Sequence, residues 1–176
     1  KYPSDINTSR GADPYLIEKD ISGAVIFKYR NSELFESWCD APPCKMHRAE
    51  YEYNDSTGTR YVGASMGEFD TKDEAEKYLE VLKADNHITD TVNGHRVLIF
   101  GTYKKTVVWI HKNLILQTIQ LETTGSPPMP VEILKSLASA YLDKYPSDPQ
   151  SEGPLPGSDE ELLEIFYEVI LTPKNQ

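Results

Sequence analysis

Residues 88–122 constrain the fold more than any other part of the chain, because they predict four consecutive strands. Asn93-Gly94 separates HITDTV from HRVLIF, and this dipeptide is the strongest short signal for a two-residue hairpin. Two further apolar runs, TVVWIH and LILQTIQLE, follow Lys104-Lys105 and Lys112-Asn113. We therefore expect a four-stranded antiparallel meander over residues 88–122.

The register of this meander predicts which side chains share a face. If Lys104-Lys105 is a two-residue turn, Trp109 faces Phe100 and His111 faces Leu98. His95 then points to the opposite face from His111, so the two histidines cannot bind one metal ion. Both faces of the hairpin are apolar, and both should therefore be covered.

The remaining segments alternate between strand and helix patterns. Strands are expected at 24–29, 48–53 and 60–69, and helices at 31–38, 71–86 and 131–145, where capping residues and apolar stripes recur. The predicted fold class is α+β: a mainly antiparallel sheet of about six or seven strands with helices packed on it. The predicted organisation is an N-terminal arm (1–20), a core domain (21–145), a linker (146–158) and a C-terminal amphipathic helix (159–176).

The element order over residues 48–144, with FDTKDEAEKYLE opening its first helix, resembles the Mog1/PsbP-like class of small secreted and lipoprotein-type domains. No functional motif carries the resemblance. It implies a compact domain, usually without enzymatic activity, that is used for binding or assembly.

Two cysteines in CDAPPC, Cys39 and Cys44, predict an intramolecular disulfide and an oxidising compartment. The alternative is a metal site made by both thiols and His47, for which zinc would need a fourth ligand. Two glycosylation sequons, at Asn7 and Asn54, agree with secretion. The chain opens at Lys1 without a signal peptide, as expected for a mature protein or an excised piece of a longer one. An extracellular or cell-surface location is therefore predicted.

The net charge of −10 argues against nucleic-acid binding, which needs basic surfaces. No run of about 18 apolar residues is present, so no membrane-spanning segment is expected. The acidic clusters lie at predicted helix N-termini, where the helix dipole explains them. Calcium is possible at residues 53–59 and 147–159, but neither segment has the ligand spacing of a calcium loop. We predict no catalytic residue, no cofactor and no metal, and each histidine is interpreted as a surface or capping residue.

The pentapeptide KYPSD occurs twice, at Lys1–Asp5 and Lys144–Asp148. Its second copy follows a predicted helix, so the first copy suggests that the chain is cut from a longer precursor or that the motif marks a domain boundary. The flanking arm and C-terminal helix carry apolar side chains that suit docking on a neighbour. These candidate assembly contacts are Tyr2, Ile6, Tyr15, Leu16, Ile17, Leu162, Ile165, Phe166 and Val169.

The sequence thus predicts a secreted or cell-surface module that is not an enzyme and has a structural, self-assembling role, as in a filament or surface layer. Copies of itself or other cell-surface proteins are the expected partners. The alternative is an extracellular ligand-binding or sensor domain of lipoprotein type. A closed pocket lined by Tyr51, Tyr53 and Trp109 would favour that alternative.

Overall fold

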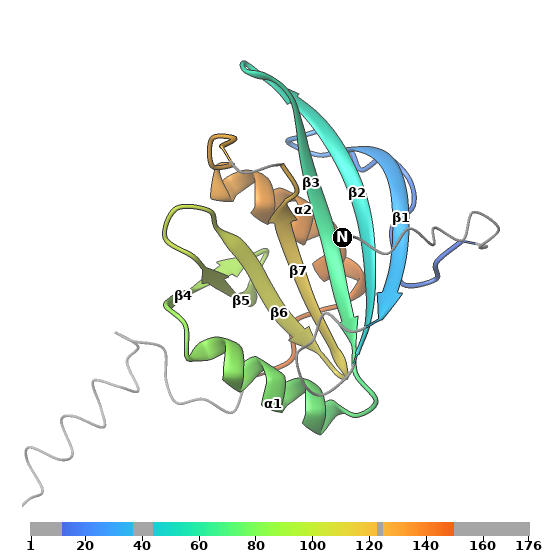
Figure 1. Ribbon diagram of the computed structural model, residues 1–176, viewed down its shortest axis with the longest axis vertical. Coiled ribbons are helices and arrows are strands. Elements are labelled where there is room, and N and C mark those ends of the chain that lie inside the picture. The colour runs from blue at the N-terminus through green and yellow to red at the C-terminus, as the bar shows by residue number, and fades with distance from the viewer. Residues whose placement is uncertain (1–11, 37–43, 123–124, 150–176) are drawn as a thin grey trace, which may run out of the picture.

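The structure is a computed structural model that describes residues 12–36, 44–122 and 125–149 (Figure 1). One antiparallel sheet of seven strands runs through the described residues in the order β1-β2-β3-β7-β6-β5-β4. The strands are β1 (Lys28–Glu36), β2 (Lys45–Asp55), β3 (Gly58–Glu68), β4 (His87–Val92), β5 (His95–Phe100), β6 (Thr106–His111) and β7 (Leu114–Gln120). Helix α1 spans Lys72–Lys83 and helix α2 spans Val131–Lys144.

The last four strands form the meander that the turn residues predict. Val92 pairs with His95 across Asn93 and Gly94, whose φ angles of 50° and 77° lie in the left-handed region. A turn of this hand matches the twist of the strands that it connects. Strands β4 to β7 therefore lie side by side in chain order.

Each helix packs on one face of the sheet, with α1 in front of it and α2 behind it in Figure 1. The α2 face holds the larger core, in which Trp109 is buried and its Nε1 donates to the Tyr145 carbonyl oxygen at 2.9 Å. The α1 face holds a smaller core around Phe69 and Leu79. At the start of α1, the Thr71 hydroxyl accepts from the Glu74 amide, so Thr71 is the N-cap of this helix.

The predicted α+β class is wrong, because the fold is mainly β. Strands make up 45% of the described residues and helices only 20%. One reason is the segment 31–38, which we expected to be helical: residues 31–36 belong to β1. A bulge between Tyr29 and Asn31 shifts the strand by one residue, and this shift hides the two-residue alternation that normally indicates a strand.

The predicted register of β5 and β6 is also wrong. Phe100 pairs with Thr106 and Leu98 pairs with Val108, so the strands are connected by a five-residue loop that opens at Gly101. Gly101 has φ +91°, and a Cβ atom there would lie 2.1 Å from the Lys104 carbonyl oxygen. Trp109 consequently lies in the core with Val97 and Ile99.

The same correction changes the expected placement of two histidines. With the observed register, strand alternation puts His95 and His111 on the same face of the sheet. His111 Nδ1 lies 2.8 Å from the Pro146 carbonyl oxygen. The described residues contain no group of three or more His, Cys, Asp or Glu side chains placed to bind a metal ion.

Candidate functional site

Part of the predicted arm packs inside the chain's own fold. Leu16 is buried in the larger core, and Tyr15 and Ile17 pack against it. The Ile17 backbone is held on both sides: the Tyr51 hydroxyl donates to its carbonyl oxygen at 2.6 Å, and its amide donates to the Tyr141 hydroxyl at 3.1 Å. These three candidate assembly contacts are therefore used within the molecule, and the packed unit begins before residue 21. We call residues 12–20 the arm segment.

The second KYPSD copy also belongs to the packed unit, although its last three residues fall in the predicted linker. Lys144 Nζ donates to the Pro14 carbonyl oxygen at 2.8 Å, and the Tyr145 hydroxyl donates to the Tyr15 carbonyl oxygen at 2.8 Å. The Asp148 amide donates to the Ile110 carbonyl oxygen at 2.9 Å. This copy thus fastens the arm segment and the end of β6. The first copy lies outside the described residues.

A buried histidine joins the arm segment to the sheet. His47 Nδ1 lies 2.7 Å from Asp13 Oδ2, and His47 Nε2 lies 2.9 Å from Glu68 Oε2. The Tyr15 hydroxyl donates to Glu68 Oε1 at 2.9 Å, and its ring packs 4.7 Å from the imidazole. Since an ionised carboxylate only accepts hydrogen bonds, both ring nitrogens donate when both acids are ionised, which is the imidazolium form.

The electrostatics of this cluster favour the charged form of Glu68. Burial tends to raise the pKa of the Glu68 carboxyl, but hydrogen bonds from His47 and Tyr15 outweigh it and hold that pKa below its ordinary value. The hydrogen bond to Glu68 and burial raise the pKa of the Tyr15 hydroxyl. Asp13 and Glu68 contact opposite nitrogens of one ring, so they do not converge on a common ion. The cluster is therefore a fastening of the arm segment to β2 and β3.

His47 was interpreted from sequence as a surface or capping residue, and this interpretation is wrong, because His47 is only 5% exposed. The signal that could have placed it was the alternation of its own strand. Ala49, Tyr51 and Tyr53 are apolar at alternate positions of β2, and a period of two puts His47 on the same face. Its two partners are 34 and 21 residues away in sequence, and no local pattern indicates them.

The free edge of β1 is protected against pairing with another strand. Its regular pairing is interrupted by the bulge between Tyr29 and Asn31. Asp20, the last residue of the arm segment, accepts a hydrogen bond from the Tyr29 amide at 2.8 Å through Oδ1. Two exposed cations, Lys28 and Arg30, flank this point. Bulges, charged side chains and covering segments are the means by which proteins prevent an edge strand from pairing with another chain.

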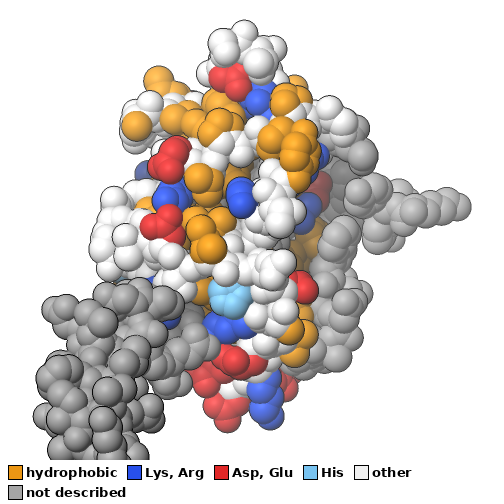
Figure 2. All heavy atoms as spheres, turned by 90° about the vertical axis from the view of Figure 1, so that its left-hand side faces the viewer, with side chains coloured by type: hydrophobic (Ala, Val, Ile, Leu, Met, Phe, Trp, Pro, Cys, Tyr) orange, Lys and Arg blue, Asp and Glu red, His pale blue; other side chains and the backbone are white. Residues whose placement is uncertain are grey.

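The free edge of β4 lacks most of these devices. Its six residues pair with β5 without a bulge, and no strand in the described part of the chain pairs with its other side. Its one large exposed apolar side chain is Ile88, which is 60% exposed. Its one anionic side chain, Asp90, lies 2.5 Å from Lys135 Nζ on α2. Figure 2 shows this side of the molecule, where hydrophobic side chains lie among charged ones.

At one end of the β4 edge, the outward-facing backbone N–H and C=O groups are available to pair with another strand. Because the turn has two residues, Val92 and His95 form a hydrogen-bonded pair. Hydrogen-bonded pairs alternate along an antiparallel ladder, so Ile88 and Asp90 also direct their backbone groups towards β5. The backbone groups of His87, Thr89 and Thr91 therefore face outward. Among these, the Thr91 amide donates to Asp90 Oδ1 at 2.7 Å. The half of the edge between His87 and Thr89 is the part left for a new strand.

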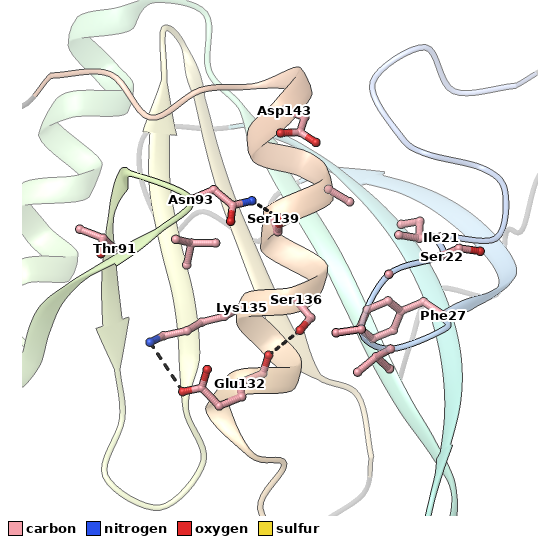
Figure 3. A pocket seen from close by; sticks show the side chains of 15 residues that line it. Ile21, Ser22, Phe27, Thr91, Asn93, Glu132, Lys135, Ser136, Ser139 and Asp143 are labelled. Carbon is pink, nitrogen blue, oxygen red and sulfur yellow. Dashed lines mark hydrogen bonds and ion pairs between the residues drawn. The ribbon is translucent and has the colours of Figure 1, made fainter.

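A cleft of about 490 Å³ lies beside this edge. Its floor is the outer side of α2, with Ser136 and Ser139, and its two walls are the β4–β5 turn and residues 21–27 (Figure 3). Asn93 donates to the Ser139 hydroxyl and thus ties the turn to the helix. Tyr51, Tyr53 and Trp109, expected to line any ligand pocket, are instead buried in the core.

The other candidate residues are only partly described. Cys44 is buried beside Phe69, but Cys39 lies outside the described residues, so the disulfide stays a prediction. Asn54 is exposed near the tip of the long β2–β3 hairpin (Figure 1). In the first possible calcium segment, Asp55 Oδ1 accepts from the Thr57 amide and Asp55 Oδ2 pairs with Arg60 at 3.2 Å. The remaining candidates all lie outside the described residues: Tyr2, Ile6, Asn7, Leu162, Ile165, Phe166 and Val169.

No protein-family model, curated protein or solved structure matches the chain. The resemblance to the Mog1/PsbP-like class therefore remains a hypothesis. Neither helix in the described part of the chain is long and apolar enough to span a membrane.

Proposed function

We propose that the protein is a secreted or cell-surface module without enzymatic activity that assembles with copies of itself, and that the free edge of β4 is its contact surface. The observation that carries the proposal is the regular β4 edge, which no strand in the described part of the chain covers and on which Ile88 is 60% exposed. Extended chains bind such edges because main-chain hydrogen bonds supply affinity without a dedicated pocket.

The contact surface differs from the terminal arms that the sequence suggested. Tyr15, Leu16 and Ile17 are engaged with their own core, and releasing them for a neighbour would break the hydrogen bonds that hold Ile17 and Tyr15. An edge strand needs no such release, because its outward backbone groups are already exposed.

A second candidate function is ligand binding in the cleft over α2. The cleft volume of about 490 Å³ falls in the range of small-molecule sites. Its lining combines serine and asparagine side chains with Ile21 and Phe27. This function would be favoured by a small molecule that copurifies with the protein and is lost on Ser139→Trp substitution, which fills the cleft floor.

The proposal is tested by the association of the full chain, measured by light scattering over a concentration series. Ile88→Lys should weaken association at least tenfold, about 1.4 kcal/mol, because it places a charge on the contact strand. Ile26→Lys is the matched control: Ile26 is 68% exposed and precedes β1, so the same substitution should leave association unchanged. A wild-type chain that stays monomeric, or an Ile88→Lys variant that associates normally, would overturn the proposal.

A further inference from the structure

Resting on the proposed function, we infer which surface of the second copy pairs with β4 and in which register. The structure assigns a closed pair, in which β4 of one copy lies antiparallel to β4 of the other, with Ile88 opposite Ile88 at the two-fold axis.

The choice of partner strand follows from the difference between the two edges of the sheet. A head-to-tail assembly would join β4 to β1 of the next copy and continue as an open filament. That arrangement needs the β1 edge, where the bulge interrupts the ladder and Asp20 occupies the Tyr29 amide. Pairing β4 with β4 uses only the unguarded edge, and it closes after two copies.

The register follows from the backbone groups that are free. Only His87, Thr89 and Thr91 direct backbone groups outward, so an added strand forms its hydrogen-bonded pairs at these residues. The Thr91 amide already donates to Asp90. One two-fold register avoids Thr91: His87 of each copy pairs with Thr89 of the other copy. In this register, Ile88 lies opposite Ile88 of the second copy.

Side-chain chemistry selects the same register. A shift of the axis to Asp90 would place two carboxylates opposite each other, which is destabilising. A shift to Thr89 would place Ile88 opposite the Asp90 carboxylate of the second copy. In the inferred register, the exposed Ile88 side chain is covered by its own copy, at a position that forms no hydrogen bonds and brings the two Cα atoms to about 4.5 Å.

This spacing lies at the close end of disulfide geometry, so single cysteines test the register in the full chain. Under mild oxidation, Ile88→Cys should give a covalent dimer as the main product and no higher species on non-reducing electrophoresis. Thr89→Cys is the matched control from the same strand. Its two copies would be offset in the inferred register, so little covalent dimer is expected.

Each other outcome has a definite meaning. Covalent dimer from Thr89→Cys in place of Ile88→Cys would overturn the register. No covalent dimer from either variant, while Ile88→Lys still abolishes association, would overturn the β4-to-β4 pairing and leave the proposed function standing. Normal association of Ile88→Lys would overturn both, because the edge would then not be the contact surface.

Discussion

The two outer strands of the sheet, β1 and β4, differ in how their free edges are protected from pairing with another chain. Each has a free edge in the described part of the chain, and free edges tend to pair with other chains. At β1 the edge is bulged, and its Tyr29 amide is capped by Asp20 from the arm segment. At β4 the ladder is regular, and the one amide cap comes from the strand's own Asp90.

The difference shows that protection at β1 depends on distant residues, whereas exposure at β4 is a local property. The arm segment that carries Asp20 is fastened across β2 and β3 by Asp13, His47 and Glu68, and the next residue, Ile21, pairs with Phe27 just before β1. Loss of the fastening should therefore loosen the cap of β1 and leave its bulge and flanking cations as the remaining protection. A sheet with two open edges can form filaments, and one with a single open edge stops at a pair.

The largest effect is expected from His47→Ala. The substitution leaves the Asp13 and Glu68 carboxyl groups without the ring that bridges them, and leaving buried polar groups without their hydrogen-bond partner typically costs about 3 kcal/mol. Urea unfolding should show this loss, and amide exchange should become faster in the arm segment and in β1. Larger assemblies should also increase, because the β1 edge then keeps only its bulge and flanking cations as protection.

His87→Ala is the matched control, because His87 is an exposed histidine on β4. Its Nδ1 lies 2.9 Å from the Asp85 carbonyl oxygen, and its ring packs beside Phe100. Its removal should change the free energy of unfolding by less than about 0.5 kcal/mol. Equal losses in the two variants would contradict the assigned role of His47 as the fastening of the arm segment.

The sequence predicts the β4 side of the sheet better than the β1 side, because its signals are local. Asn93-Gly94 defines a two-residue turn, and the apolar runs around it have the length of buried strands. The predicted β5–β6 register is wrong because the loop begins at Gly101, which has φ +91°, and not at Lys104-Lys105. An edge strand such as β1 carries polar residues, and its bulge removes the period of two, so its pattern resembles a helix.

The fastening of the arm segment could be predicted only in part. Alternation along β2 places His47 on the buried face, but its need for acidic partners does not identify Asp13 or Glu68. Glu68 becomes a neighbour only through the β2–β3 register, and Asp13 only once Leu16 and Ile17 are in the core. The β4 edge was missed for a different reason: an exposed edge is a property of strand order, which the chain specifies only through tertiary packing.

Acid should weaken the fastening of the arm segment to β2 and β3. Because the folded pKa of Glu68 lies below its ordinary value of 4.5, its contribution to stability is full above that value. The contribution is lost as the pH falls from about 4.5 towards the folded pKa. Thermal unfolding between pH 7 and pH 3.5 should therefore show a falling midpoint, together with faster exchange in the arm segment.

Glu68→Gln separates this effect from general acid sensitivity. The amide cannot lose charge on acidification, so the variant should be less stable at pH 7 and show a shallower fall below pH 4.5. On the β4 side, the stability that Asp90 contributes should also be lost in acid, because the hydrogen bond from Lys135 holds the pKa of Asp90 below its ordinary value. A pH profile in Glu68→Gln as steep as in the wild type would show that other carboxyls dominate the acid response.

The smallest effect is expected from Asp20→Ala, which removes the cap of β1 while keeping the arm segment fastened. Asp20 is exposed, and within the described residues its side chain makes one hydrogen bond, to the Tyr29 amide, so the free energy of unfolding should fall by only about 1 kcal/mol. Exchange of the Tyr29 amide should become about fivefold faster, as about 1 kcal/mol implies, with β4 amides unchanged. Asp20→Asn retains an oxygen acceptor in the same place and should behave like the wild type. If Asp20→Ala forms larger assemblies and Asp20→Asn does not, a single hydrogen bond keeps the second edge of the sheet closed. If neither does, the bulge and the flanking cations protect β1 by themselves.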